Sequence, residues 1–496
     1  MNNWRPKLGN KLFRPRLFSS HLRKSLGITG LFSSGYGNVG SSIYYGLGLV
    51  ALAALGLTPI ALMIAGLIFV ANSLSYAEGG AMIPEGGGSA SFARHAFSDL
   101  TGFVAGWALM LTYVVTMAIS AFTIPPYLAH FWPILKEPFY CTLGSIIIVA
   151  FLMLVNIAGI RESSRLNIIF IVIDIATQVS LVVMGIIFIL WANPQVLVQN
   201  MFGPGNVPNF EGFIMGVALA ALCFTGVETI SQLAEETKRP GIRIPRAYFL
   251  LIFVVLLLFA GISVVALATM TPHVLGDPIN GWAKDPIAGI AANMPNQLVR
   301  DIFEPLVALL AASILLTGTN AGLIGISRLS FNMSRNNLIP PSLARVHSRF
   351  RTPYVSIIFF CVIVVILLIP GFFNPLFFVD LSGLYVFGSL LGFSLAHASI
   401  IGLRIFQPFK PRPFMIRGNI SLGIRKIPLI AVFGLLATLS IWILIVITQP
   451  FSRWVGFTWM IAGFLLFYLF RRYRHLPFLS KLGDKVGKSS EQPPSA

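Results

Sequence analysis

Long apolar runs recur along almost the whole chain, and each is long enough to cross a lipid bilayer. A helix that spans the hydrocarbon core needs about 20 predominantly apolar residues. Because 56% of the 496 residues are hydrophobic and only 10% are charged, the chain has too little polar surface for a water-soluble globule. The expected fold class is therefore an all-α membrane protein. About twelve spans are predicted by the length rule, near residues 26–52, 58–78, 100–128, 139–159, 166–192, 211–235, 247–271, 302–333, 354–372, 376–403, 427–448 and 454–470.

The positions of the lysines and arginines predict the orientation of these spans. Lys and Arg concentrate in short cytoplasmic loops. With the N-terminus placed inside, 31 of the 35 cations fall in the termini or in inward-facing connections; the exceptions are Lys136, Lys284, Arg300 and Arg453. We therefore expect a multi-pass protein of the cell membrane (inner or plasma) with both termini cytoplasmic. The net charge of +18 is interpreted as a topology signal that also attracts anionic lipid headgroups, and no nucleic-acid partner is expected.

Two spans contain residues that disfavour a continuous helix. Residues 30–42 of the first span carry four glycines, several serines and Asn38, and the sixth span reads Cys-Phe-Thr-Gly-Val-Glu-Thr over residues 223–229. Glycine also serves close helix packing in membranes, which is the alternative explanation for one such cluster. Unwound backbone inside a bilayer is tolerated only where it lines a cavity or is buried in protein. Interruptions at corresponding positions of two halves are the sequence pattern of an inverted-repeat transporter.

A helix that is broken at mid-membrane offers polar backbone groups to a ligand. Free N–H groups at a half-helix N-terminus suit a carboxylate, and free carbonyl oxygens suit an ammonium or a cation. A site with both fits a zwitterion, so amino acids are the expected substrates. The candidate substrate-binding residues are Tyr36, Gly37, Asn38, Val39, Gly40, Ser41 and Ser42 of the first span and Phe224, Thr225, Gly226 and Val227 of the sixth.

Three stretches of the chain match a known family pattern. Residues 224–247 combine Phe-Thr-Gly-Val-Glu with a Glu-Glu pair and a Pro-Gly-Ile-Arg-Ile-Pro-Arg-Ala loop, residues 37–43 form a glycine loop, and residues 327–340 follow the eighth span. With these features the chain resembles the amino acid–polyamine–organocation family over roughly residues 25–470. The resemblance implies a LeuT-like fold with two inverted five-helix repeats, discontinuous helices 1 and 6, and appended helices 11 and 12. It also implies alternating access, in which helices 1, 2, 6 and 7 rock against helices 3, 4, 8 and 9.

The resemblance divides the chain into five parts. A basic tail precedes the first repeat, and the last two helices with their preceding loop follow the second. The expected boundaries are 1–25 for the N-terminal tail, 26–192 for the first repeat, 211–404 for the second, 405–472 for helices 11 and 12, and 473–496 for a partly disordered C-terminal tail.

Two departures from the family pattern bear on the site. The family's glycine loop commonly ends Gly-Ser/Thr-Gly, whereas this chain places Ser42 at the last position, which favours a small or unusually placed substrate. Many members carry a lysine on helix 5, nine residues after a basic residue in a Lys/Arg-x-Asn start. Counted from Arg165, that position is Asp174 in this chain. An aspartate in that place suggests a site for Na⁺ or H⁺, completed by helix-1 carbonyls and the hydroxyls of Thr317 or Thr319; the alternative is a structural hydrogen bond to a neighbouring helix.

The other acidic and aromatic candidates have gating or structural interpretations. Glu228 is expected either to gate and couple through protonation or to accept hydrogen bonds from helix ends. Phe224 is the preferred aromatic gate. Glu235 and Glu236 are expected to form an ion-pair lock with Lys238 and Arg239. Glu78 and Asp380 are expected at the interfaces, solvated.

The sequence predicts neither an enzyme nor a cofactor, apart from a coupling ion. No histidine pairs with a nucleophile motif, and the isolated cysteines 141, 223 and 361 have no metal or disulfide spacing. The predicted function is a secondary amino-acid transporter, coupled to H⁺ or Na⁺ or working by exchange. The alternatives are a polyamine or inorganic-cation transporter on the same fold, and a sensor that binds amino acids without translocating them.

Overall fold

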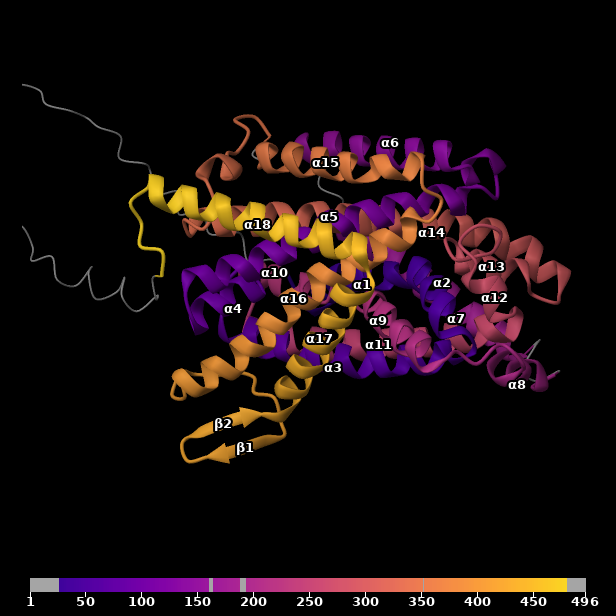
Figure 1. Ribbon diagram of the computed structural model, residues 1–496, viewed down its shortest axis with the longest axis horizontal. Helices are drawn as coiled ribbons and strands as arrows, with labels where there is room; N and C mark the ends of the chain where they lie inside the picture. Colours follow the sequence, from indigo (N-terminus) through magenta and orange to yellow (C-terminus); the bar gives the residue numbers. More distant parts are fainter. Residues whose placement is uncertain (1–25, 160–163, 188–192, 351, 480–496) are drawn as a thin grey trace, which may run out of the picture.

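The computed structural model describes residues 26–159, 164–187, 193–350 and 352–479. Its long elements are α-helices packed side by side in one bundle (Figure 1). Ten described segments are long and apolar enough to cross a membrane. One of them, Ile28–Met82, contains the first two predicted spans, and the sixth predicted span is split into shorter helices. Every predicted span therefore has a helical counterpart, which confirms the all-α membrane fold class.

The helices that correspond to the predicted spans begin and end close to the predicted limits. Helix 1 consists of α1 (Ile28–Val39), a 3₁₀ turn at Gly40–Ser42 and α2 (Ile43–Ala54); helices 2 to 5 are α3 (Thr58–Met82), α5 (Asp99–Leu128), α6 (Pro138–Ile157) and α7 (Ser164–Gly185); helix 6 comprises α9 (Phe210–Cys223) and α10 (Thr229–Gln232); helices 7 to 12 are α11 (Pro240–Thr269), α14 (Gln297–Arg335), α15 (Tyr354–Leu368), α16 (Phe377–Phe406), α17 (Leu429–Thr448) and α18 (Pro450–Tyr473).

Burial ranks these helices from the centre of the bundle to its periphery. In α5 the most apolar window is 94% buried, whereas the corresponding windows of α17 and α18 are only 22% buried. A helix that is apolar on all sides belongs either in a protein core or in lipid. Helix 3 is therefore the central packing element, and helices 11 and 12 expose apolar side chains where a bilayer would cover them.

Short elements occupy the connections between the long helices. The bundle end that holds α4 (Ser89–Ala96) is called the inner end here, following the predicted orientation, and α8 (Gln195–Phe202) lies near the opposite, outer end (Figure 1). The connection 272–301 between helices 7 and 8 contains α12 (Pro272–Gly276) and α13 (Pro286–Ala292). An antiparallel hairpin of β1 (Asn419–Leu422) and β2 (Arg425–Pro428) precedes α17. Elements this short lack the periodic apolar pattern that identifies a span.

Several expectations fall outside the described residues. The N-terminal tail 1–25 is one of them, together with Arg161 and most of the C-terminal tail 473–496. The limits of the two repeats and the cytoplasmic placement of the termini stay predictions.

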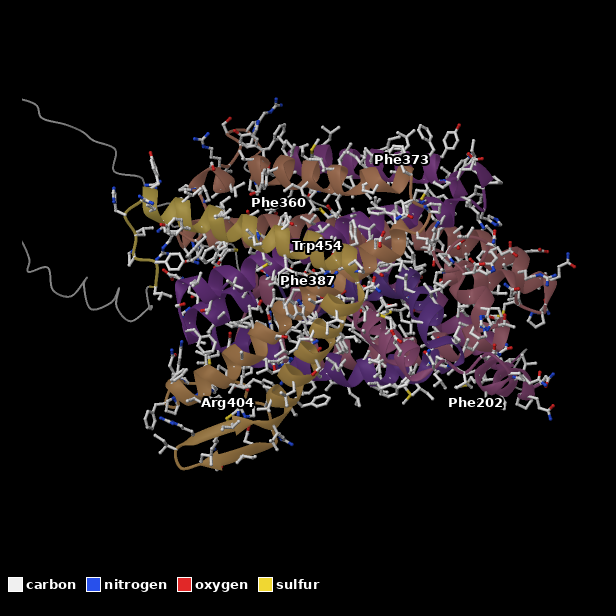
Figure 2. All side chains as sticks on the ribbon, in the orientation of Figure 1. Phe202, Phe360, Phe373, Phe387, Arg404 and Trp454 are labelled. Carbon is white, nitrogen blue, oxygen red and sulfur yellow. The ribbon has the colours of Figure 1, made fainter. Side chains whose placement is uncertain are left out.

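Glu78 is not a solvated interfacial residue, which corrects the expectation from its position near a span end. Its side chain is 1% exposed and is paired with Arg404, which is 2% exposed, near the end of α16 (Figure 2). The Arg404 Nε donates to one carboxylate oxygen at 2.8 Å, and the backbone N–H of Ile416 donates to the other at 2.9 Å. Arg404 also donates to the Asn419 side chain. Helix 10 supplies the counter-charge that a short sequence window around Glu78 does not contain. Asp380, by contrast, is partly exposed and accepts a hydrogen bond from Asn374.

We expect Glu78→Gln to destabilise the protein strongly. The substitution leaves the buried guanidinium of Arg404 without its counter-charge, and breaking a buried pair in this way costs about 3–5 kcal/mol. Thermal unfolding in detergent measures the effect, with the exposed Arg417→Gln as control. An unchanged unfolding temperature for Glu78→Gln would contradict the buried pair.

Candidate functional site

Helix 1 is interrupted by a tightened turn and is not unwound. Val39 and Ile43, on either side of the 3₁₀ turn, keep right-handed helical backbone angles. The Ser41 and Ser42 hydroxyls lie 2.9 and 3.4 Å from the Asn38 carbonyl oxygen, to which they donate. Ser42 also contacts the Tyr45 hydroxyl at 3.1 Å. The interruption is therefore milder than the glycine cluster suggests, and the extra side chain of Ser42 is held against its own helix.

Helix 6, in contrast, opens fully between α9 and α10. Gly226 has φ = +94°, a conformation that L side chains rarely adopt. In the described part of the chain, the N–H groups of Gly226, Val227 and Glu228 donate to no backbone carbonyl. The Thr225 hydroxyl caps the carbonyl of Leu222 at 2.7 Å. The sequence cluster at 223–229 thus leaves three backbone N–H groups inside the bundle without a carbonyl partner among the described residues.

Asn38 joins the two interrupted helices directly. A Cβ atom on Gly226 would lie 2.6 Å from the Asn38 Cγ, so the two residues are in the closest contact that a glycine allows. The Asn38 Nδ2 donates to the Thr229 Oγ1 at 2.8 Å, and its Oδ1 has no partner among the described residues. In α14, Gly318 makes a similar approach to Ser41. Helices 1, 6 and 8 therefore converge on the predicted residues.

A cavity of about 80 Å³ lies beside this contact. Ser34 and Gly37 of α1, Thr229 and Gln232 of α10, and Thr317, Asn320 and Arg328 of α14 are among its lining residues. A cavity needs roughly 10–15 Å³ to hold one water molecule, so this one admits several waters or a small ligand group. Of the residues predicted from sequence, Gly37 and Thr317 line it.

Two ion pairs link the 3₁₀ turn Ala234–Glu236, which follows α10, to helix 8 beside the cavity. Glu236 pairs with Arg328 at 2.8 Å, and Glu235 pairs with Arg335 at 3.0 Å. The predicted lock is therefore present with different partners, because α14 brings its arginines closer than Lys238 and Arg239. The backbone of Leu26 also holds this segment, because its N–H donates to the Glu236 carbonyl and its carbonyl accepts from the Lys238 N–H.

Asp174 bridges the two halves of helix 1. The Tyr36 hydroxyl of α1 donates to its Oδ2 at 2.9 Å, and the Tyr44 hydroxyl of α2 donates to its Oδ1 at 2.5 Å. Gln178, one turn along α7, donates to Oδ2 at 2.9 Å. Each carboxylate oxygen of this 1%-exposed residue therefore has a neutral donor. This geometry corresponds to the structural alternative that the sequence left open.

The predicted cation site near Asp174 does not gather its expected ligands. The Thr317 and Thr319 hydroxyls donate to carbonyls of their own helix, those of Ser313 and Leu315. Over the described ranges, no group of three or more His, Cys, Asp or Glu side chains is placed to hold a metal ion. A Na⁺ site made of backbone carbonyls and the Asp174 carboxylate stays a prediction.

The Glu228 carboxylate is buried and accepts no hydrogen bond of normal geometry from the described residues. Its side chain is fully buried, and neither oxygen has a hydrogen-bond partner among the described residues, although the backbone N–H groups of Gly226 and Glu228 lie near it. Four phenols lie within electrostatic range of this carboxylate, those of Tyr76, Tyr113, Tyr248 and Tyr385. An unpaired buried carboxylate is costly when charged, so its position fits a group that takes up a proton.

Phe224, the aromatic gate predicted from the sequence, packs against aromatic rings of two other helices. Its ring packs between Phe69 of α3 and Phe259 of α11, with centroid distances of 5.1 and 5.3 Å. The aromatic residues that hold the helix-1 turn are instead Tyr36 and Tyr44. The i, i+4 spacing of Asp174 and Gln178 on one face of α7 was the available sequence signal for that arrangement. A gating role for Phe224 stays a prediction.

We expect Gly226→Ala to be much more damaging than Gly205→Ala. Both glycines have positive φ, +94° and +79°, so both substitutions carry a similar backbone strain. Only at position 226 does the added methyl meet Asn38, because nothing lies within 4 Å of the corresponding point at Gly205. Thermal unfolding and ligand binding measure the difference. Equal losses for the two variants would show that the contact with Asn38 is unimportant.

Comparison with known proteins gives a family for this arrangement. A family model described as "Amino acid permease" matches residues 26–469. The branched-chain amino acid permease BcaP of Bacillus subtilis is 28% identical over 473 residues, covering 91% of this chain and 94% of the relative. The methylthioribose transporter of the same organism is 26% identical, with 92% and 95% covered. The human large neutral amino acids transporter small subunit 2 is 25% identical, with 92% and 82% covered.

Proposed function

This chain belongs to the amino acid permease family and is an integral, multi-pass membrane transporter rather than an enzyme, and on that premise we propose that it moves amino acids by alternating access. In this proposal the substrate binds between the helix-1 turn and the open segment of helix 6. The transporter operates as an ion-coupled symporter or as an exchanger, in the cell membrane, with both termini cytoplasmic.

The observation that carries the proposal is the contact of Asn38 with Gly226 and Thr229 beside backbone N–H groups that have no carbonyl partner. The N–H groups of residues 226–228 donate to no backbone carbonyl among the described residues, and a cavity lies next to Thr229. N–H groups without a carbonyl partner can bind a carboxylate, and the unpartnered Asn38 Oδ1 is an acceptor for an ammonium group.

The side chains around the helix breaks favour a neutral amino acid over a polyamine. No candidate substrate-binding residue of helices 1 and 6 is charged. Asp174, which could attract a cation, already accepts three hydrogen bonds from neutral donors. A multiply charged polyamine would need several carboxylates. The relatives named for branched-chain and large neutral amino acids support the same class of substrate.

We expect purified protein in liposomes to take up labelled neutral amino acids such as leucine. The experiment compares leucine, lysine, putrescine and methylthioribose, each with and without pH and Na⁺ gradients and with or without unlabelled substrate inside. Leucine uptake that unlabelled leucine accelerates from inside identifies exchange, and uptake that a gradient drives identifies symport. Saturable leucine binding without uptake or exchange would identify a sensor, and uptake of putrescine or methylthioribose alone would replace the proposed substrate.

Glu228 and Asp174 are expected to differ in how they affect coupling. The Glu228 carboxylate has no full hydrogen bond and can change protonation without breaking one, whereas Asp174 is held by Tyr36, Tyr44 and Gln178. Glu228→Gln should abolish the response of uptake to a pH gradient. Asp174→Asn should keep that response but lower stability by about 1–3 kcal/mol, because the amide presents a donor to a hydroxyl that itself donates.

The same uptake measurements can contradict this assignment of roles to Glu228 and Asp174. Loss of gradient dependence in Asp174→Asn, with Glu228→Gln still responsive, would make Asp174 the coupling residue, as the resemblance first suggested. Tyr36→Phe serves as the matched control, since it removes one hydrogen bond to Asp174 without changing any carboxylate.

A further inference from the structure

The β-hairpin before α17 has one polar and one largely apolar face. The register pairs Ile420 with Ile427 and Leu422 with Arg425, and directly opposed residues of an antiparallel pair share a face. Ile420, Leu422, Ile427 and Arg425 therefore lie on one face, with Arg425 at its turn end, and Asn419, Ser421, Lys426 and Pro428 lie on the other. Ile420 and Leu422 are 49% and 58% exposed, and Ile424 in the turn is 68% exposed.

The segment that contains the hairpin is basic and has no acidic residue. Between residues 405 and 428 the sequence contains no Asp or Glu. Its cations are Lys410, Arg412, Arg417, Arg425 and Lys426. Arg417, Arg425 and Lys426 are exposed, and in the part of the chain that the structure describes no carboxylate lies within ion-pair distance of these three. The positive charge is therefore available to an external anionic partner.

The hairpin is fixed to the bundle at the depth where the helices end. The Asn419 side chain accepts a hydrogen bond from Arg404, which is itself paired with the buried Glu78 of α3. Figure 1 shows the hairpin beside the bundle at its inner end, next to α16 and α17, rather than beyond the ends of the helices. Arg404 lies close to the start of the hairpin in Figure 2. The lateral neighbour of a membrane helix at this depth is the lipid headgroup region.

A two-stranded hairpin with an uncovered apolar face needs a partner for that face. An isolated hairpin is marginal in water, and exposed apolar patches mark interaction surfaces. Its unpaired strand edges exclude the hydrocarbon core, where every backbone group must be satisfied. The interfacial layer meets both conditions, because it accepts apolar side chains, hydrates the strand edges and supplies phosphates to Lys and Arg.

We propose that the hairpin Asn419–Pro428 is a docking site for anionic phospholipids of the surrounding bilayer. Ile420, Leu422 and Ile424 enter the headgroup–acyl boundary. Arg425 and Lys426, with Arg417 at the base, bind the lipid phosphates. The site is independent of which substrate the protein carries, since it requires only a membrane at the level of α16 and α17.

A fluorescent probe on the hairpin tests the proposal. The native cysteines Cys141, Cys223 and Cys361 are buried, so a cysteine introduced by Leu422→Cys can be labelled selectively with bimane. The protein is placed in nanodiscs of phosphatidylcholine alone or mixed with phosphatidylglycerol. In the mixed discs we expect a blue shift of the probe and quenching by spin-labelled lipid. The same label at Ser421→Cys, on the opposite face, should be quenched less.

Two matched charge variants assign the effect to the hairpin. Arg425→Gln with Lys426→Gln should abolish the response to phosphatidylglycerol, whereas Arg472→Gln with Arg474→Gln, which removes two exposed cations from the end of α18, should leave it intact. The proposal is overturned if the bimane at position 422 shows the same emission and the same quenching in both kinds of nanodisc. It is equally overturned if the α18 variant loses the response as fully as the hairpin variant. Size-exclusion profiles verify that each variant is folded.

Discussion

The rest of the structure depends on one constraint, that polar backbone groups inside a bilayer must find partners within the protein. Within the described residues, eleven of the predicted spans meet it with helical hydrogen bonds, helix 1 needing only a single 3₁₀ turn. Helix 6 does not meet it at residues 226–228. Asn38, Thr229 and Tyr248 contact this open segment, the last through a hydrogen bond to the Val227 carbonyl at 3.0 Å. The opening is therefore tolerated only because helices 1 and 7 enclose it, and the donors left over define the candidate site.

The buried carboxylates likewise divide into those that have hydrogen-bond partners and one that lacks them. Glu78 has a guanidinium and a backbone N–H, and Asp174 has two phenols and an amide. Both carboxylates serve as connections between helices. Glu228 is different, because it is buried to the same degree and lacks a full hydrogen bond. The unsatisfied carboxylate belongs to a residue of the open segment itself, and the satisfied ones are distant from that segment along the chain.

Sequence reasoning predicted the spans and the two interruptions because both depend on local patterns. A run of about 20 apolar residues defines a helix in lipid, and a Gly-Val-Glu stretch at mid-span cannot continue one cheaply. The partners of individual side chains were harder to predict. Glu78 and Arg404 are separated by 326 residues, and Tyr36 and Asp174 by 138. Such pairs are set by helix packing, so a sequence window around either residue contains no sign of the other. The same limit explains why Glu235 and Glu236 were assigned to Lys238 and Arg239, when α14 supplies their partners.

The hydrogen bonds that Tyr36 and Tyr44 donate to Asp174 restrict how helix 1 can bend. Tyr36 lies before the 3₁₀ turn and Tyr44 lies after it, yet both hydroxyls end on the same carboxylate of α7. A hinge at Gly40–Ser42 would swing one tyrosine away from that carboxylate while the other stayed. The carboxylate therefore braces helix 1 across the 3₁₀ turn, and bending the helix there costs at least one of these two buried hydrogen bonds.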